Sequence, residues 1–187
     1  MPTGYQISKQ EAAHYLTLQV IDWVDLFTRK RYRDIVVDSL NYCISNKGLI
    51  VYSYVIMSNH VHLLVQAENA NLSNVLRDLK KYTSSQLLFS IQNETESRRE
   101  WVLQRFSDAA SKHARNEHFQ LWTHENHAEE VFSNQFTLQK VRYIHDNPLR
   151  AGIVKSPEEY LYSSAANYAG EKRLVDVTVL NLHSLMI

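Results

Sequence analysis

The chain has 187 residues and a mass of 21.8 kDa, which corresponds to one domain of usual size with room for an appended segment. Its 20 Lys and Arg residues balance 20 Asp and Glu residues, and this zero formal charge argues against a uniformly basic nucleic-acid binder. The four glycines are too far apart for a phosphate-binding loop, the one cysteine cannot form an internal disulfide, and no apolar run is long enough to cross a membrane. These features exclude nucleotide-cofactor enzymes of the Walker and dinucleotide-binding kinds, and we expect a cytoplasmic protein with no membrane partner.

Hydrophobic periodicity predicts three strands and two helices in the N-terminal half. Residues 14–21 alternate between apolar and polar, as in a half-buried strand, and residues 29–46 carry apolar side chains at helical spacing before a glycine stop. Residues 49–56 and 60–66 are rich in β-branched and aromatic residues and flank a turn, which predicts an antiparallel hairpin. A longer helix should follow, from a cap at Asn71 to about residue 91.

The C-terminal half is more polar and is predicted to be largely helical. Residues 93–116 read as a partly ordered excursion with a short helix, and the apolar stripe around Val141 predicts a helix that ends before Pro148. Ser156 begins a capping box and predicts a second late helix, and weak alternation over 174–180 predicts a short terminal strand. This order of elements predicts an α+β sandwich built on an antiparallel sheet.

Two histidines on the second hairpin strand form the first candidate site. Alternation along a strand places His60 and His62 on one face and Val61 on the other, so both imidazoles could ligate one metal ion. The alternative is that one is a turn histidine and the other a half-buried strand histidine without a ligand.

The helix that follows carries a tyrosine and an amide one turn apart. With Leu79 as the centre of the buried face, Tyr82 and Gln86 both point along that face at 100° per residue, where polar groups need partners. Two imidazoles and an amide oxygen could hold a divalent ion that polarises a phosphate, and Tyr82 beside them could act as a nucleophile for strand transfer. Alternatively, Tyr82 extends its hydroxyl from the rim of the core and Gln86 bonds a backbone carbonyl.

Three ordered blocks of the sequence resemble a known family. The first is VIMSNHVHLLV followed by LRDLKKYTSSQ, and the other two are VRYIHDNPLRAGIV and EEYLYSSAANYAG. Together they resemble the HUH single-tyrosine transposases of bacterial insertion sequences, especially the REP-associated tyrosine transposase-like relatives. The resemblance spans about residues 14–170.

The resemblance implies a ferredoxin-like antiparallel sheet with packed helices, the HUH nuclease fold, and a C-terminal helical extension. We expect a single domain over residues 1–187, with its core at about 14–92 and the helical part at about 117–170. Relatives bind single-stranded DNA that folds into hairpins, cleave it through a 5′-phosphotyrosine, and rejoin it with magnesium or manganese. The expected place of action is the nucleoid in the cytoplasm.

Residue by residue, the resemblance assigns the metal ligands to His60, His62 and Gln86 and the nucleophile to Tyr82. The candidates for phosphate contacts lie in three basic segments, residues 29–33, 71–115 and 140–155. Together these segments hold 16 of the 20 Lys and Arg residues but only 6 of the 20 Asp and Glu residues. The alternative is that these side chains are solvated helix surface. The candidate DNA-binding residues are Arg29, Lys30, Arg31, Arg33, Lys80, Lys81 and Arg150.

Two other functions and one structural question stay open at this point. A non-catalytic DNA-hairpin-binding protein derived from such a transposase would share the fold, and an unrelated metal-dependent hydrolase would need a carboxylate near the two histidines. A homodimer is possible, in which Tyr82 could act in cis or in trans.

Overall fold

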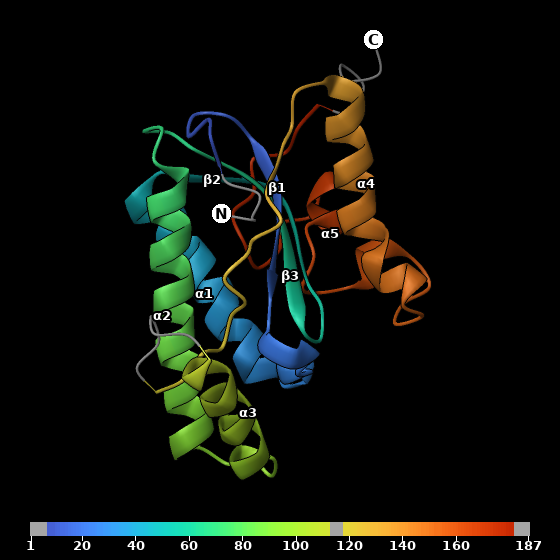
Figure 1. Ribbon diagram of the computed structural model, residues 1–187. Helices are drawn as coiled ribbons and strands as arrows, with labels where there is room; N and C mark the ends of the chain where they lie inside the picture. Colours follow the sequence, from blue (N-terminus) through green and yellow to red (C-terminus); the bar gives the residue numbers. More distant parts are fainter. Residues whose placement is uncertain (1–6, 113–117, 182–187) are drawn as a thin grey trace.

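The computed structural model describes residues 7–112 and 118–181, in which a four-stranded antiparallel sheet is covered by helices on both faces (Figure 1). The spatial order of the strands is β2-β3-β1-β4, as in a ferredoxin-like sheet, so the predicted fold class is confirmed. The strands are β1 (His14–Gln19), β2 (Leu49–Ile56), β3 (His60–Ala67) and β4 (Glu129–Glu130).

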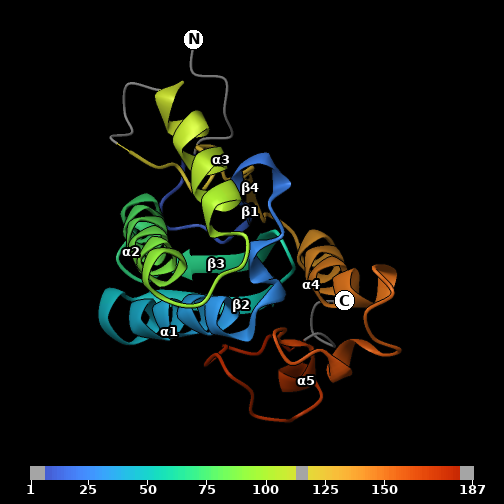
Figure 2. The same cartoon turned by 90° about the horizontal axis from the view of Figure 1, so that it is seen from below.

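The helices divide between the two faces of the sheet. Helices α1 and α2 cover one face, and α4 and α5 lie on the other side (Figures 1 and 2). No helix in residues 7–112 and 118–181 is long and apolar enough to cross a membrane. The helices are α1 (Lys30–Lys47), α2 (Leu72–Asn93), α3 (Arg99–Ser111), α4 (Asn134–Arg150) and α5 (Ala165–Tyr168), with 3₁₀ turns η1 (Ile21–Trp23), η2 (Leu26–Thr28) and η3 (Pro157–Glu159).

The register between β1 and β3 decides which side chains meet on each face. Leu18 pairs with Val61, and both are buried on the face under α1 and α2. Thr17 pairs with His62, and because side chains alternate along a strand, this pair lies on the face under α4. One face of the sheet therefore presents apolar side chains to α1 and α2, and the other presents polar side chains such as Thr17 and His62.

Helix α1 and the hairpin match the predicted bounds closely because their signals are local. α1 ends at Gly48, which has the left-handed φ of 65° and donates its N–H to the Cys43 carbonyl. A Cβ at this glycine would lie 3.1 Å from Glu68 Oε2, so the position favours glycine for space as well as for conformation.

Two predictions about the late helices are wrong. Helix α4 does not end before Pro148 but runs through it to Arg150. Since this proline lies in the last turn, its missing N–H costs the helix one backbone hydrogen bond, and the residue is buried. The capping box at Ser156 forms as predicted, but it opens only the three-residue turn η3 and no longer helix.

Three other predicted segments also differ from the structure. The excursion over 93–116 contains the 13-residue helix α3, and residues 113–116 of that prediction lie outside the described residues. Residues 174–180 form no strand, although the Thr178 N–H donates to the Val51 carbonyl at 2.8 Å. Asn71 precedes α2 as predicted but its side chain makes no capping hydrogen bond.

Candidate functional site

The two histidines of β3 lie side by side on the α4 face of the sheet. The ring centroids of His60 and His62 are 4.5 Å apart, and Val61 between them points into the core on the other face with no exposed surface. The prediction that the two imidazoles share a face is confirmed.

Each imidazole is held by a hydrogen bond at the same ring atom. Nδ1 of His62 lies 2.9 Å from both the Tyr15 hydroxyl and the Thr17 hydroxyl, and Nδ1 of His60 lies 2.7 Å from Asn59 Oδ1. In the tautomer that carries the proton on Nδ1, each ring donates that proton to a neighbouring oxygen and its Nε2 lone pair is available, and neither Nε2 has a hydrogen-bond partner within the described ranges. Metal-binding histidines are oriented in the same way, through the ring nitrogen that does not bind the metal.

The surroundings keep both rings uncharged. Burial, with smaller effects of the neighbouring His60 and of the positive charges of Lys140 and Arg150, lowers the pKa of His62 from 6.5 to about 3. Burial also lowers the pKa of His60. Both imidazoles are therefore neutral at physiological pH, which is the form that ligates a metal ion.

A tyrosine of α4 lies directly against the histidine pair. The ring of Tyr143 meets that of His62 edge to face, with the centroids 5.3 Å apart, and 37% of the tyrosine is exposed to solvent. The guanidinium of Arg150 lies 4.5 Å from the centre of the Tyr143 ring. Lys140 and Asn147 lie one turn before and one turn after the tyrosine on the same side of α4. A phenol, two neutral imidazoles and cationic groups thus meet at one place on the surface.

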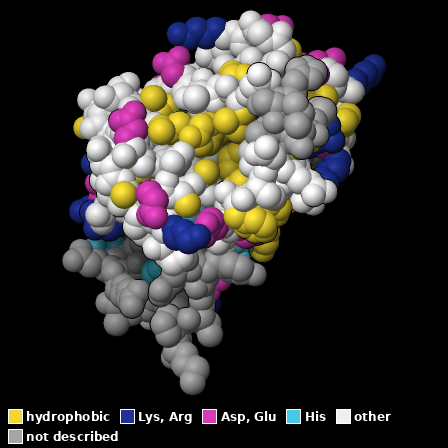
Figure 3. All heavy atoms as spheres, turned by 90° about the horizontal axis from the view of Figure 1, so that it is seen from above, with side chains coloured by type: hydrophobic (Ala, Val, Ile, Leu, Met, Phe, Trp, Pro, Cys, Tyr) yellow, Lys and Arg dark blue, Asp and Glu magenta, His cyan; other side chains and the backbone are white. Residues whose placement is uncertain are grey.

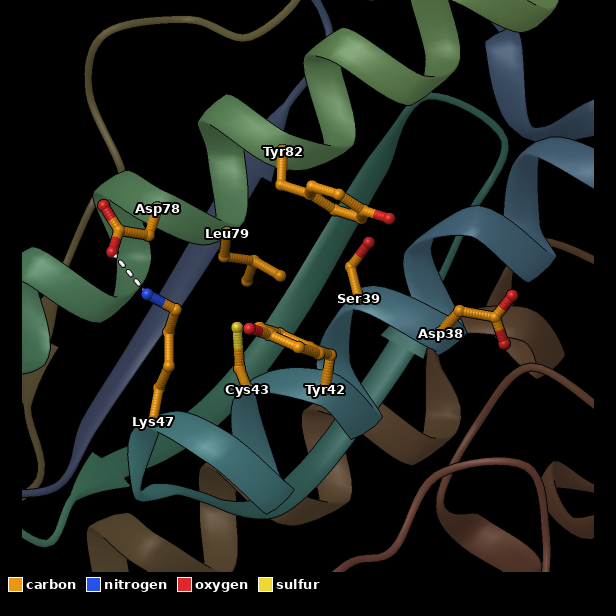
Figure 4. Close-up of a pocket in the computed structure, with 8 residues that line it drawn as sticks. All are labelled: Asp38, Ser39, Tyr42, Cys43, Lys47, Asp78, Leu79 and Tyr82. Atoms are coloured by element: carbon orange, nitrogen blue, oxygen red, sulfur yellow. Dashed lines mark hydrogen bonds and ion pairs between the residues drawn. The ribbon is translucent and has the colours of Figure 1, made fainter.

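The prediction that Tyr82 and Gln86 converge on the histidines is wrong within one chain. Both residues belong to α2, which covers the opposite face of the sheet. Tyr82 is 54% exposed and stacks on Tyr42 of α1, with the ring centroids 6.5 Å apart. It lines a pocket of about 510 Å³ between α1 and α2, where its hydroxyl points across toward α1 (Figure 4).

The error comes from a drift of the buried stripe along α2. The buried residues Leu79, Thr83, Leu87 and Ile91 recur every four residues, and each step of four turns the stripe by about 40° on a helix of 3.6 residues per turn. A buried direction taken from the first turns of the helix therefore places Tyr82 too far inward. Thr83, not Tyr82, is the polar residue of this turn that is buried, and it accepts a hydrogen bond from Trp122 Nε1 at 3.0 Å.

The sequence did contain a signal for Tyr143. Tyr143 and Asn147 repeat the spacing of Tyr82 and Gln86, a tyrosine followed four residues later by an amide, within VRYIHDNPLRAGIV, the second of the three family-like blocks. The predicted site used α2, the helix that follows the histidines in sequence. In the fold it is α4, which lies far from them in sequence, that covers their face of the sheet.

Several basic residues predicted to contact DNA are engaged within the chain instead. Glu96 is buried, and its carboxylate forms ion pairs with Arg29 at 2.7 Å and with Arg31 at 3.9 Å. Lys80 Nζ donates to the Thr123 carbonyl and to Asn126 Oδ1, both at 2.8 Å, and burial lowers its pKa to about 8. These three side chains hold neighbouring segments together and are not free for phosphates.

The other predicted basic residues lie in different surroundings. Lys30 pairs with Asp34 at the start of α1, the guanidinium of Arg33 lies over the Tyr162 ring, and Lys81 is exposed on α2. Arg150 alone among the seven candidates stands beside the histidine site. Figure 3 shows Lys and Arg side chains scattered among Asp and Glu around a hydrophobic band, with no continuous basic patch on the described part of this face.

The described residues thus form a ferredoxin-like sheet that presents a His-x-His pair to a tyrosine on a covering helix. A family model described as "Transposase IS200 like" matches residues 24–147, a span that includes both histidines and Tyr143. The chain therefore belongs to the IS200-like transposase family.

A solved structure and a search of curated proteins complete the comparison. The chain is similar to a structure described as a REP-associated tyrosine transposase bound to a REP hairpin, with a TM-score of 0.63, 13% sequence identity and 96% of each chain covered. This likeness shows that the fold is shared over nearly the whole length. No curated protein matches the chain.

Proposed function

We propose that the chain is a single-stranded DNA endonuclease and strand transferase that acts on hairpin-bearing DNA ends through a 5′-phosphotyrosine. The observation that carries the proposal is the contact between Tyr143 and His62, which brings a partly exposed phenol to a pair of neutral imidazoles. Family membership supports a transposase-like reaction on DNA. Tyr143 takes the role that the sequence assigned to Tyr82.

The proposed step exchanges one phosphodiester for another. The Tyr143 oxygen attacks the scissile phosphorus, the phenolic proton passes to solvent, and the bond from phosphorus to the 3′ oxygen breaks. The released 3′ oxygen takes up a proton from solvent, so this DNA end leaves as a 3′-hydroxyl, and the 5′ phosphate stays on the tyrosine. Because the phosphotyrosine keeps the phosphodiester energy, a second 3′-hydroxyl can reverse the step and join a new strand.

The donor set fits a divalent metal ion at this place. His60 and His62 would contribute their Nε2 atoms, and Asn147 would contribute Oδ1, since its Nδ2 donates to the Tyr143 carbonyl at 3.1 Å. Within residues 7–112 and 118–181, no three His, Cys, Asp or Glu side chains are placed to hold a metal ion together, so we propose the amide of Asn147 as the third protein ligand. A bound magnesium or manganese ion would polarise a phosphate oxygen as a Lewis acid.

The groups around Tyr143 suit a DNA phosphate. Arg150 lies against the tyrosine ring, and an open groove of about 610 Å³ runs along α4 with Arg142, Tyr143 and Arg150 among its lining residues. Guanidinium groups bind phosphate oxygens in two-pronged geometry and would compensate the charge of the transition state. The similar structure was solved with a hairpin bound, which supports a DNA hairpin as the partner. We place this activity at DNA in the cytoplasm. In this proposal one chain supplies both the histidine pair and Tyr143, so the tyrosine acts in cis.

Two tyrosine variants test the proposal. The protein is incubated with manganese and a labelled DNA hairpin that has randomised single-stranded flanks, and covalent complexes are separated by denaturing electrophoresis. We expect Tyr143→Phe to abolish the covalent band and the matched variant Tyr82→Phe to retain it. A covalent band that persists in Tyr143→Phe but is lost in Tyr82→Phe would return the nucleophile to α2, with a second chain supplying it.

A second experiment separates strand transfer from simple hairpin binding. His62→Ala should abolish the covalent band while the affinity for the hairpin stays close to that of the unchanged protein. If the unchanged protein binds the hairpin but never forms a covalent band with manganese or magnesium, the chain is a hairpin-binding protein without catalysis.

A further inference from the structure

A tryptophan projects from the protein beside the histidine pair. Trp23 belongs to η1, directly after β1, and 59% of it is exposed to solvent. Its ring meets that of His60 edge to face, with the centroids 6.2 Å apart. The exposed part of the indole thus lies at the rim of the site that the proposed function uses.

The backbone holds this tryptophan in an unfavourable conformation. Asp22 and Trp23 have φ values of 50° and 56°, in the left-handed region that bulky side chains rarely adopt. Val20 and Val24 on either side are buried, so the turn is anchored while its two central residues face outward. Backbone strain of this kind is retained where the surrounding structure enforces it, and it concentrates at functional sites.

Asn59 connects Trp23 to the histidine pair through hydrogen bonds. Asn59 donates from Nδ2 to the Trp23 carbonyl at 3.3 Å, and its Oδ1 lies 2.7 Å from Nδ1 of His60. The same side chain therefore fixes the position of η1 and the orientation of one imidazole. A molecule that contacts Trp23 is placed relative to His60 through this link.

We propose that Trp23 stacks on an unpaired base of the single-stranded DNA next to the scissile phosphate and is a positioning residue for strand cleavage. This inference rests on the proposed function. An exposed indole offers a flat surface on which any base can stack, and such stacking is a general means of holding single-stranded DNA. In the proposed function, the scissile phosphate lies at the adjoining histidines. A base that stacks on Trp23 would therefore hold the neighbouring phosphate of the same strand at those histidines.

Binding measurements test the inference without requiring cleavage. The affinity for the dye-labelled DNA hairpin with single-stranded flanks is measured by fluorescence anisotropy without added metal ion. We expect Trp23→Ala to weaken binding by roughly 5- to 150-fold, the range for loss of one stacked base. Trp23→Phe should restore most of the affinity. Phe89→Ala is the matched control, because Phe89 is 61% exposed on α2, the helix on the other face of the sheet, and its loss should leave binding unchanged.

Abasic sites identify the stacked base. An abasic site is placed at one flank position at a time, and the unchanged protein should lose affinity at one position by about as much as Trp23→Ala does. On that substrate the Trp23→Ala variant should lose nothing further. Equal affinities of the unchanged protein and Trp23→Ala, or losses that simply add at every abasic position, would overturn the inference.

Two further results separate the inference from the proposed function. If the unchanged protein forms a covalent band and Trp23→Ala binds DNA as tightly as the unchanged protein, strand transfer is supported and the stacking role of Trp23 is refuted. A change of oligomeric state in Trp23→Ala, measured by light scattering, would assign the exposed indole to a contact between copies of the chain and overturn stacking. Weakened binding in Trp23→Ala, with no further loss at the one sensitive abasic position and no covalent band with either metal ion, supports stacking and refutes catalysis.

Discussion

His145 is a buried imidazole that should make the folded chain sensitive to acid. Its Nε2 lies 3.1 Å from the Ser53 hydroxyl and 2.9 Å from the Ser164 hydroxyl, between α4 and the sheet. Burial lowers the pKa of His145 from 6.5 to about 4, against a smaller opposite effect of the Glu158 charge. The folded chain therefore keeps this ring neutral at a pH at which the unfolded chain protonates it.

The direction of the effect follows from proton binding. Between pH 6.5 and about 4 the unfolded state binds more protons at His145 than the folded state does, so the free energy of unfolding falls as the pH falls. The difference in pKa corresponds to about 3 kcal/mol once the pH lies below both values, and about 2 kcal/mol of this is lost by about pH 5. Above about pH 7 the full stability is present.

The assay compares urea unfolding of the unchanged protein and of His145→Gln at neutral pH and near pH 5. Glutamine keeps an oxygen acceptor for the two serine hydroxyls but does not titrate. On acidification the unchanged protein should lose about 2 kcal/mol more than the variant. His62, whose pKa is also lowered, acts equally in both proteins and cancels in the comparison. Equal losses in the two proteins would refute the assignment of a buried neutral His145.

Three further predictions concern separate sites, and each has its own measurement. Glu96→Gln should lower the free energy of unfolding by about 3 kcal/mol, measured by urea denaturation, because it removes the buried carboxylate on which three arginines converge; a loss below 1 kcal/mol would contradict this role. Thr17→Val should weaken manganese binding about 10-fold in calorimetry, since it removes one support of His62 Nδ1, and unchanged affinity would refute that support. Arg150→Gln should reduce the salt dependence of DNA binding by about one phosphate contact, whereas Lys80→Gln should not, and the reverse order would place the DNA on α2.

The features that sequence reasoning predicted correctly depend on local patterns. Alternation along a strand has a fixed period of two, so the shared face of His60 and His62 follows from their spacing alone. The end of α1 follows from Gly48, because a left-handed residue after an apolar helical stripe stops a helix. Neither feature requires knowledge of where other elements pack.

The features that it missed depend on packing between distant segments. Which helix covers the face of the two histidines is decided by chain topology, and a helical wheel for α2 cannot show that α2 lies on the other side of the sheet. The pairing of Arg29 with Glu96 joins residues 67 apart, so a basic run in the sequence did not reveal that its charges are neutralised. The strained turn at Trp23 likewise has no glycine to mark it.

The central claim is that the tyrosine beside the histidine pair attacks DNA, and mass spectrometry of the covalent complex tests it most directly. The unchanged protein is reacted with the DNA hairpin and manganese, digested with nuclease and trypsin, and searched for a peptide that carries a nucleotide. Trypsin cuts after Arg142 and Lys81, so Tyr143 and Tyr82 begin different peptides. We predict the nucleotide on the peptide of residues 143–150. A nucleotide on the peptide that begins with Tyr82, with the Tyr143 peptide unmodified, would contradict the account.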